Sequence, residues 1–174
     1  PSEMTAHQLI HDLGYEYSMV KTVLPGVHQR EVTMNHDDFR AQFGLTPGHW
    51  LLLMVAHDLG KKGLLTVLQA MQNLPDDVHL LCTRDRERSS HWESKVKSLG
   101  LSHRVHWLPK SFDLGLTYSN VDVLVHPTKA DVYGMVLIEA MSHGLPVICT
   151  PAPYCGAAWS WMHKEQAWLL QSPE

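Results

Sequence analysis

The chain has little cysteine and no long apolar run. The first absence argues against a disulfide-stabilised protein and the second against a membrane-spanning one. Three cysteines, Cys82, Cys149 and Cys155, occur among 174 residues. A small and odd number of cysteines argues against a disulfide framework and is typical of proteins of the reducing cytoplasm. The longest apolar stretches, such as residues 51–56, are far too short to span a bilayer. We therefore expect a cytoplasmic protein with no transmembrane segment, and peripheral attachment at the inner face of a membrane stays open.

Positive charge is also scarce. Lysine and arginine number 14 against 18 aspartates and glutamates, which gives a net charge of -4 with histidine neutral. Nucleic-acid-binding proteins need a basic surface, so nucleic acid is not an expected partner. The length suffices for one domain with its own core. Because the chain starts at Pro1 rather than at methionine, we expect it to be part of a longer protein.

Several catalytic and cofactor motifs are missing. The sequence contains no GxGxxG, no GxxxxGK[ST] and no GxSxG, which disfavours a nucleotide-dependent oxidoreductase and a hydrolase with a nucleophile elbow. Thirteen histidines raise the question of a metal. His7 and His11 stand four apart on a predicted helix, as zinc ligands can, but no third ligand is evident. We expect no metal and no cofactor.

What the sequence does contain is a regular alternation of strands and helices from residue 50 onward. Apolar runs predict strands at 50–55, 78–82, 105–107, 121–125, 146–149 and 167–170. Helical patterns lie between them, at 64–72, 88–99, 112–118, 134–143 and 157–163. Strand, helix and strand at this spacing predict right-handed βαβ units and a parallel sheet, and all-apolar strands indicate helices on both faces. We therefore predict a doubly wound, Rossmann-like α/β fold of about six strands, with ligands at the carboxyl ends of the strands.

The first 45 residues follow another pattern. They predict a helix over 2–12, a short strand over 20–24 before Pro25-Gly26, and a helix over 35–43 that Asn35 caps. We predict an interdomain entry segment at 1–45 and the α/β domain at 46–174.

Two lysines follow the first predicted strand, in the loop 56–63 (AHDLGKKG). Lys61 and Lys62 stand at the start of the next helix, where unpaired N–H groups and the helix dipole are already positive. Lysine is normally disfavoured there, and the flanking glycines let a ligand approach the backbone, so the loop indicates an anion site. A solvated loop with two surface lysines would explain the same residues equally well.

The loop 126–134, after the fourth predicted strand, is more informative. Gly134 begins a helix whose first N–H groups are open to a phosphate or a sugar. Glu139 lies in the apolar run 135–141, where an unpaired carboxylate would be costly. Helical side chains lean toward the N-terminus, so Glu139 is able to reach a ribose bound there. The alternatives are a salt-bridged or solvent-facing Glu139, and an Asp131 that is an ordinary loop or capping residue.

These residues carry a resemblance. Asp131 and Glu139, separated by seven residues and followed by Ala140-Met141, Gly144 and 146–148 (PVI), resemble the hallmark of retaining GT-B glycosyltransferases of family 4. The Lys61-Lys62-Gly63 sequence is similar to the family's donor-phosphate loop, and 24–27 (LPGV) to the segment that joins its two domains. Lipopolysaccharide-core glucosyltransferases are the subgroup that it resembles most.

The resemblance implies a C-terminal, donor-binding GT-B domain and a role for each site residue. Lys62 would neutralise the diphosphate of a nucleoside-diphosphate sugar, assisted by Lys61. Glu139 would hold the ribose, and Asp131 would bind hydroxyls of the transferred sugar. The backbone N–H groups of Tyr133, Gly134 and Met135 would contact the sugar and phosphates. Lys62, Asp131 and Glu139 are thus the candidate catalytic residues.

The expected function is transfer of a sugar from a nucleoside diphosphate, expected to be UDP, to a glycan or lipopolysaccharide acceptor. A domain missing from this chain would bind the acceptor, so we expect the isolated chain to transfer no sugar. The chain departs from the family pattern at Asp131, where glutamate is usual, and at Ala56-His57, where Gly-Arg is usual. Residues 82–85 replace a Gly-rich turn, with Arg84 able to contact the nucleotide. The alternative is a catalytically inactive nucleotide-sugar-binding module.

Overall fold

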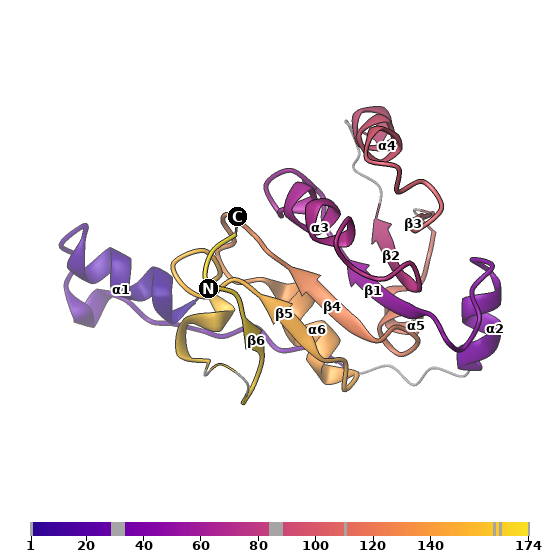
Figure 1. Ribbon diagram of the computed structural model, residues 1–174. Helices are drawn as coiled ribbons and strands as arrows, with labels where there is room; N and C mark the ends of the chain where they lie inside the picture. The colour runs from indigo at the N-terminus through magenta and orange to yellow at the C-terminus, as the bar shows by residue number, and fades with distance from the viewer. Residues whose placement is uncertain are drawn as a thin grey trace.

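The protein is built around one parallel sheet. A computed structural model describes residues 2–28, 34–83, 89–109, 111–161, 163 and 165–173. Among these residues six parallel strands lie in the order β3-β2-β1-β4-β5-β6 (Figure 1). Their bounds are β1 Trp50–Met54, β2 Val78–Thr83, β3 Val105–Leu108, β4 Val123–His126, β5 Val147–Cys149 and β6 Trp168–Leu169. The strand order reverses between β1 and β4, which places the expected ligand crevice outside the ends of these two strands. The predicted doubly wound sheet is confirmed.

Helices cover both faces of the sheet because the strands are apolar on both. Alternate residues of β1 point to opposite sides: Leu51 and Leu53 enter one core cluster, and Met54 enters the other. The first cluster includes residues of α2 (His36–Ala41), α5 (Leu114–Tyr118) and α6 (Met135–Ser142). The second includes residues of α3 (Leu64–Met71) and packs against Trp92 and Val96 of α4 (Ser89–Ser98). In Figure 1, α3 and α4 lie together on one side of the sheet.

Two helices begin directly at the predicted ligand loops. Gly63 precedes α3 and Gly134 precedes α6, both in the left-handed conformation with φ of 84° and 90°. A Cβ at Gly63 would lie 2.1 Å from the carbonyl oxygen of Pro127, so only glycine lets the two loops meet here. The amide of Lys129 donates to the Lys61 carbonyl at 2.9 Å and joins the same loops. From the sequence we expected Gly63 to let a ligand approach the backbone, whereas in the structure it allows the loop after β1 to pack against the loop after β4.

Two predicted elements differ from the structure. Residues 20–24 were expected to form a strand, but the described residues 20–28 include no strand, and a 3₁₀ turn, Tyr17–Met19, precedes them. The pattern of apolar residues favours extended backbone there, but a strand also needs a neighbour to pair with, and Val23 and Leu24 remain exposed. The helix expected over 157–163 is a shorter 3₁₀ turn, Ala157–Ser160. No helix in the described part of the chain is long and apolar enough to cross a membrane.

The entry segment contains two helices with different roles. Helix α1 (Glu3–His11) begins at Ser2, whose Oγ accepts from the Thr5 amide, and projects away from the sheet (Figure 1). Helix α2 packs Phe39 fully into the core. The division of the chain at residue 45 stays a prediction, and the second helix of the entry segment contributes to the core of the α/β fold.

Candidate functional site

A cavity of about 770 Å³ lies at the carboxyl ends of the central strands. It brings together residues that are far apart in the sequence, because the loops after β1, β3 and β4 and the first turns of α6 all border it. Lys62, Asp131 and Glu139 all line it. Further lining residues are Ala56, His57, Asp58, Lys61, Thr83, Leu108, Pro109, Phe112, Leu114, His126, Met135 and Val136. The predicted cation and both predicted carboxylates therefore share one cavity at the carboxyl edge of the sheet.

Lys62 and Asp131 form the polar centre of this cavity. The Lys62 Nζ lies 2.5 Å from Asp131 Oδ2 and also donates to the Ala130 carbonyl at 3.1 Å. Each of the two side chains is 19% exposed, so solvent reaches the pair only in part. The His126 Nε2 lies 3.1 Å from the same carboxylate oxygen, and this histidine is 1% exposed. The loop after β4 therefore holds a cation, an anion and an imidazole within direct contact.

The electrostatics of this group favour an ionised Asp131. Burial alone would raise the pKa of its carboxyl, but the hydrogen bond with His126 and the ion pair with Lys62 outweigh burial. Together they hold the pKa of Asp131 well below its usual range. An aspartate in this state is a hydrogen-bond acceptor and cannot serve as an acid near neutral pH.

The N-terminal turn of α6 supplies backbone donors beside the carboxylate. The Tyr133 amide donates to Asp131 Oδ1 at 3.3 Å, whereas the carbonyl of Tyr133 accepts from the Ala157 amide at 2.7 Å. The amides of Gly134 and Met135 stand at the first turn, where a helix has no internal acceptor to offer. The partial positive charge of the α6 N-terminus therefore lies at the same cavity as the Lys62 ammonium group. Of the three predicted backbone donors, Tyr133 already serves Asp131.

Glu139 has a protein partner that sequence reasoning did not identify. Its Oε2 accepts a hydrogen bond of 2.9 Å from the hydroxyl of Tyr118, a residue of α5 that is 3% exposed. Burial raises the pKa of Tyr118, and the neighbouring Glu139 carboxylate raises it further, so the phenol stays protonated and donates. This contact explains how a glutamate is tolerated in an apolar run. Glu139 also borders a second cavity of about 540 Å³ that Tyr118 and His143 line.

At the end of β2, where this sequence lacks the Gly-rich turn, Thr83 forms two hydrogen bonds with the backbone of Ala56. The Thr83 hydroxyl accepts from the Ala56 amide at 2.8 Å and donates to the Ala56 carbonyl at 2.9 Å. This pair fixes the end of β1 just before the lysine loop. His57 and Lys61 line the cavity as exposed side chains. Arg84 lies outside the described residues.

The structure brings the predicted Lys62, Asp131 and Glu139 together at one cavity, and their binding roles stay a prediction. Sequence reasoning missed His126 and Tyr118, which contact the two carboxylates. His126 directly follows the strand predicted over 121–125 and is the first residue of the loop 126–134, which was a usable signal. Tyr118 gave no such signal, because its meeting with Glu139 depends on how α5 packs against α6.

Metal binding has no geometric support in the part of the chain that the structure describes, where no group of three His, Cys, Asp or Glu side chains is arranged to hold an ion. The rings of His7 and His11 instead lie 4.2 Å apart, and His7 also contacts Trp159. The expectation of no metal stays a prediction.

Comparison with protein families agrees with this geometry. The family model described as glycosyl transferases group 1 matches residues 35–174. The chain belongs to this glycosyltransferase family. The match includes both ligand loops and helix α2, and it begins at the residue that caps this helix.

Individual glycosyltransferases match most of this chain but much less of their own length. Lipopolysaccharide glucosyltransferase WaaG of Escherichia coli K12 is 28% identical over 142 residues, which cover 77% of this chain and 37% of WaaG. A crystal structure of WaaG has a TM-score of 0.66 at 30% identity, covering 77% of this chain and 38% of that one. The chain therefore spans less than two fifths of this relative.

A second solved structure matches almost the whole chain. Anabaena Alr3699/HepE, solved in complex with UDP and glucose, has a TM-score of 0.85 at 19% identity. The match covers 98% of this chain and 48% of that one. At such identity the likeness establishes the fold, a Rossmann-like half of a GT-B glycosyltransferase.

Proposed function

We propose that this chain is the donor-binding domain of a retaining glycosyltransferase that uses a nucleoside-diphosphate sugar, namely a UDP-sugar. The observation that carries the proposal is the meeting of Lys62, the N-terminus of α6 and Glu139 around one cavity. A cation and open helix amides suit a diphosphate, and a carboxylate suits the hydroxyls of a ribose. The cavity, at about 770 Å³, is within the size range of small-molecule sites.

The chemistry assigns each group a place. When the glycosidic bond of the donor breaks, negative charge grows on the departing diphosphate. Lys62 and the first amides of α6 stabilise that charge where it develops. Glu139 positions the nucleotide through its ribose, and Asp131 accepts hydrogen bonds from the sugar. No metal ion is needed for this role.

The choice of UDP and of the acceptor draws support from the relatives. HepE has been solved with UDP-glucose, and WaaG is named as a lipopolysaccharide glucosyltransferase. We propose that the acceptor is a glycan or a lipopolysaccharide core. A second domain would bind it, and the protein would work in the cytoplasm, at the inner face of a membrane where the acceptor is lipid-linked.

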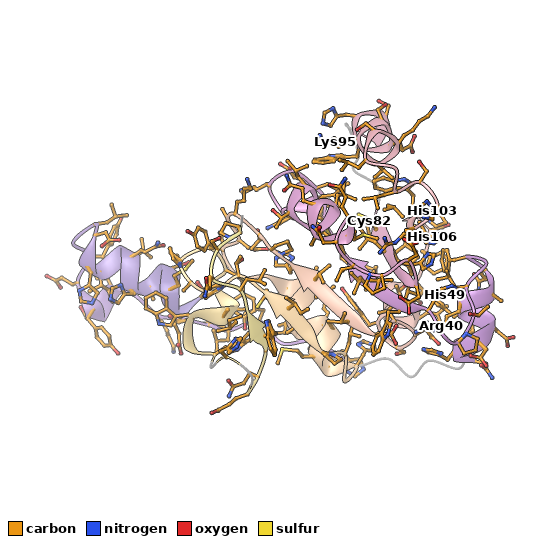
Figure 2. The ribbon with its side chains drawn as sticks, viewed as in Figure 1. Arg40, His49, Cys82, Lys95, His103 and His106 are labelled. Carbon is orange, nitrogen blue, oxygen red and sulfur yellow. The ribbon has the colours of Figure 1, made fainter. Side chains whose placement is uncertain are left out.

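Calorimetry with two variants tests the proposal. Lys62→Ala and Glu139→Ala should each weaken UDP binding by about 1–3 kcal/mol, because each removes a charge-assisted contact. Lys95→Ala is the matched control, since Lys95 lies on α4 (Figure 2) and does not line the cavity. Titration of the unchanged chain with UDP-, GDP- and ADP-glucose identifies the base. Unchanged UDP affinity in both site variants would refute the assignment.

A catalytically inactive nucleotide-sugar-binding module is the second candidate. Asp131 and His57 favour it, because both depart from the family pattern. The full-length protein separates the two functions. Sugar transfer that Asp131→Ala abolishes supports the enzyme, whereas binding of a UDP-sugar without transfer supports the module.

A further inference from the structure

Lys62, the cation assigned to the donor diphosphate, is bound within the protein by two oxygens of the loop after β4. Its Nζ contacts Asp131 Oδ2 at 2.5 Å and the Ala130 carbonyl at 3.1 Å. An ammonium group has three N–H donors, so two of the three are directed at this loop. A diphosphate that reaches Lys62 must compete with Asp131 for the same charge.

Asp131 is equally engaged. Its Oδ2 contacts both Lys62 and His126, and its Oδ1 accepts from the Tyr133 amide. A carboxylate offers about four acceptor positions, so three are in use. Because Lys62 and Asp131 both line the cavity, departure of Lys62 frees an acceptor position on a carboxylate that borders it.

We propose that Lys62 exchanges Asp131 for the donor diphosphate, and that the vacated position on Asp131 then accepts a hydroxyl of the transferred sugar. This inference rests on the proposed function and deepens it. Phosphate binding and sugar binding become coupled, because the first event prepares the second. Asp131 is then the residue that makes the site select the intact nucleotide sugar over the nucleotide product.

The selectivity follows from counting partners. UDP separates Lys62 from Asp131 and leaves the half-buried carboxylate with one partner fewer, which is costly. A UDP-sugar separates the same pair but returns a hydroxyl to Asp131. After transfer the product UDP lacks that hydroxyl, so re-formation of the ion pair favours its release.

His126 keeps Asp131 in place during the exchange. With its proton on Nε2 it donates to Oδ2 whether Lys62 is present or not. Its Nδ1 is buried without a partner among the described residues, so Nε2 is the ring nitrogen through which this side chain makes its hydrogen bond. His126 is therefore a positioning residue that acts through Asp131.

The substitution Asp131→Asn tests the exchange. Asparagine keeps an acceptor for the Tyr133 amide but no longer pairs with Lys62 as a charge. In calorimetric titrations of the chain, UDP should bind Asp131→Asn about fivefold more tightly than the unchanged chain, the size expected for releasing one partly screened ion pair. The preference for UDP-glucose over UDP should shrink. Asp131→Ala should likewise raise the affinity for UDP and reduce the preference for UDP-glucose. Circular dichroism checks that each variant is folded.

A double-mutant cycle excludes simple charge repulsion as the cause. Removing any carboxylate near a diphosphate lowers repulsion, so UDP affinity alone is not decisive. In a Lys62→Met background the ion pair is already absent, so Asp131→Asn should raise UDP affinity by less than about twofold, the part that reduced repulsion contributes. An equal gain in both backgrounds would overturn the exchange.

Asp58→Asn is the matched control. Asp58 lines the same cavity, and its Oδ1 accepts from the Lys61 amide, a bond that asparagine keeps. Its effect on UDP affinity should be less than about twofold, because no ion pair with Lys62 is released. A gain as large as that of Asp131→Asn would contradict the exchange. If the unchanged chain bound neither UDP nor UDP-glucose, the proposed function itself would fail; binding without coupling removes the exchange alone.

Discussion

Charged residues lie at both edges of the sheet, but their partners differ. At the amino edge Arg104, which is 3% exposed, donates to the carbonyls of Met71, Leu74, Pro75 and Val78. It also contacts the carboxylate of the exposed Asp76 at 3.3 Å. At the carboxyl edge Lys62 and Asp131 bind each other beside a cavity. A cation held by several fixed backbone oxygens is part of the structure. A cation held by one carboxylate and one carbonyl beside a cavity, as Lys62 is, is available to a competing anion.

The amino edge is closed in other ways as well. Asp122 Oδ2 accepts from the Leu51 amide at 2.6 Å and from Arg40 at 2.7 Å, which fastens α2 to the sheet. His79 Nδ1 lies 3.0 Å from His106 Nε2, and the ring of His49 packs against His79 at 4.8 Å. Figure 2 shows Arg40, His49 and His106 at the α2 end of the molecule. The polar groups at this edge are bonded to other groups of the protein. We therefore expect substitutions here to alter the stability of the fold and not its affinity for a nucleotide.

The largest effect should come from Arg104→Met, which removes the cation but keeps much of the apolar stem. It removes the guanidinium donor from four carbonyls between α3 and the start of β2, of which those of Met71 and Pro75 keep one backbone donor each. The free energy of unfolding should fall by about 3 kcal/mol or more. Urea denaturation measures this loss. UDP affinity of the folded variant should be unchanged. A loss below about 1 kcal/mol would show that these carbonyls find other partners.

A smaller loss of stability should follow when the pH is lowered. Burial lowers the pKa of His79 from 6.5 to about 4, and His106, His49, Arg104 and His103 act in the same direction. The unfolded chain therefore binds a proton that the folded chain resists, and the free energy of unfolding should fall as pH drops from about 6.5 to about 4. Asp131 acts in the same direction at lower pH, since its lowered pKa means that its stabilising contribution is lost only as pH falls below the usual range of an aspartate.

Denaturation at a series of pH values measures this loss, with His79→Gln as the comparison. The variant should show a flatter dependence across the same window. An equally steep dependence in His79→Gln would assign the effect to other groups.

The smallest effect is expected from Tyr118→Phe, which should alter nucleotide selectivity at the carboxyl edge. Tyr118→Phe removes the hydroxyl that orients Glu139 but keeps the buried ring. The preference for UDP over 2′-deoxy-UDP should fall by about 1 kcal/mol, because a less well oriented carboxylate distinguishes the ribose hydroxyls less well. Affinity for 2′-deoxy-UDP itself should hardly change. A parallel loss for both nucleotides would indicate general damage to the cavity instead.

The six strands, and the meeting of Lys62, Asp131 and Glu139 at the carboxyl edge, could be predicted from the sequence, because each depends on local pattern. The binding roles of the three residues stay a prediction. Apolar runs mark strands, and a lysine or glutamate in an unfavourable place marks a partner. The strand expected at 20–24 was wrong because pairing depends on what lies beside it. The contacts Lys62–Asp131 and Tyr118–Glu139 join residues that are 69 and 21 positions apart, and neither leaves a trace in local pattern.

The central claim is that the carboxyl edge, through Lys62, Glu139 and the first turn of α6, holds a nucleoside diphosphate. Amide chemical-shift mapping by NMR, with UDP added to the ¹⁵N-labelled chain, tests it most directly. The account predicts that the largest shifts fall on Lys62, Tyr133, Gly134 and Met135, whereas the amides of His79 and His106 keep their positions. Largest shifts at the amino edge or on α1, or none at all at saturating UDP, would contradict it.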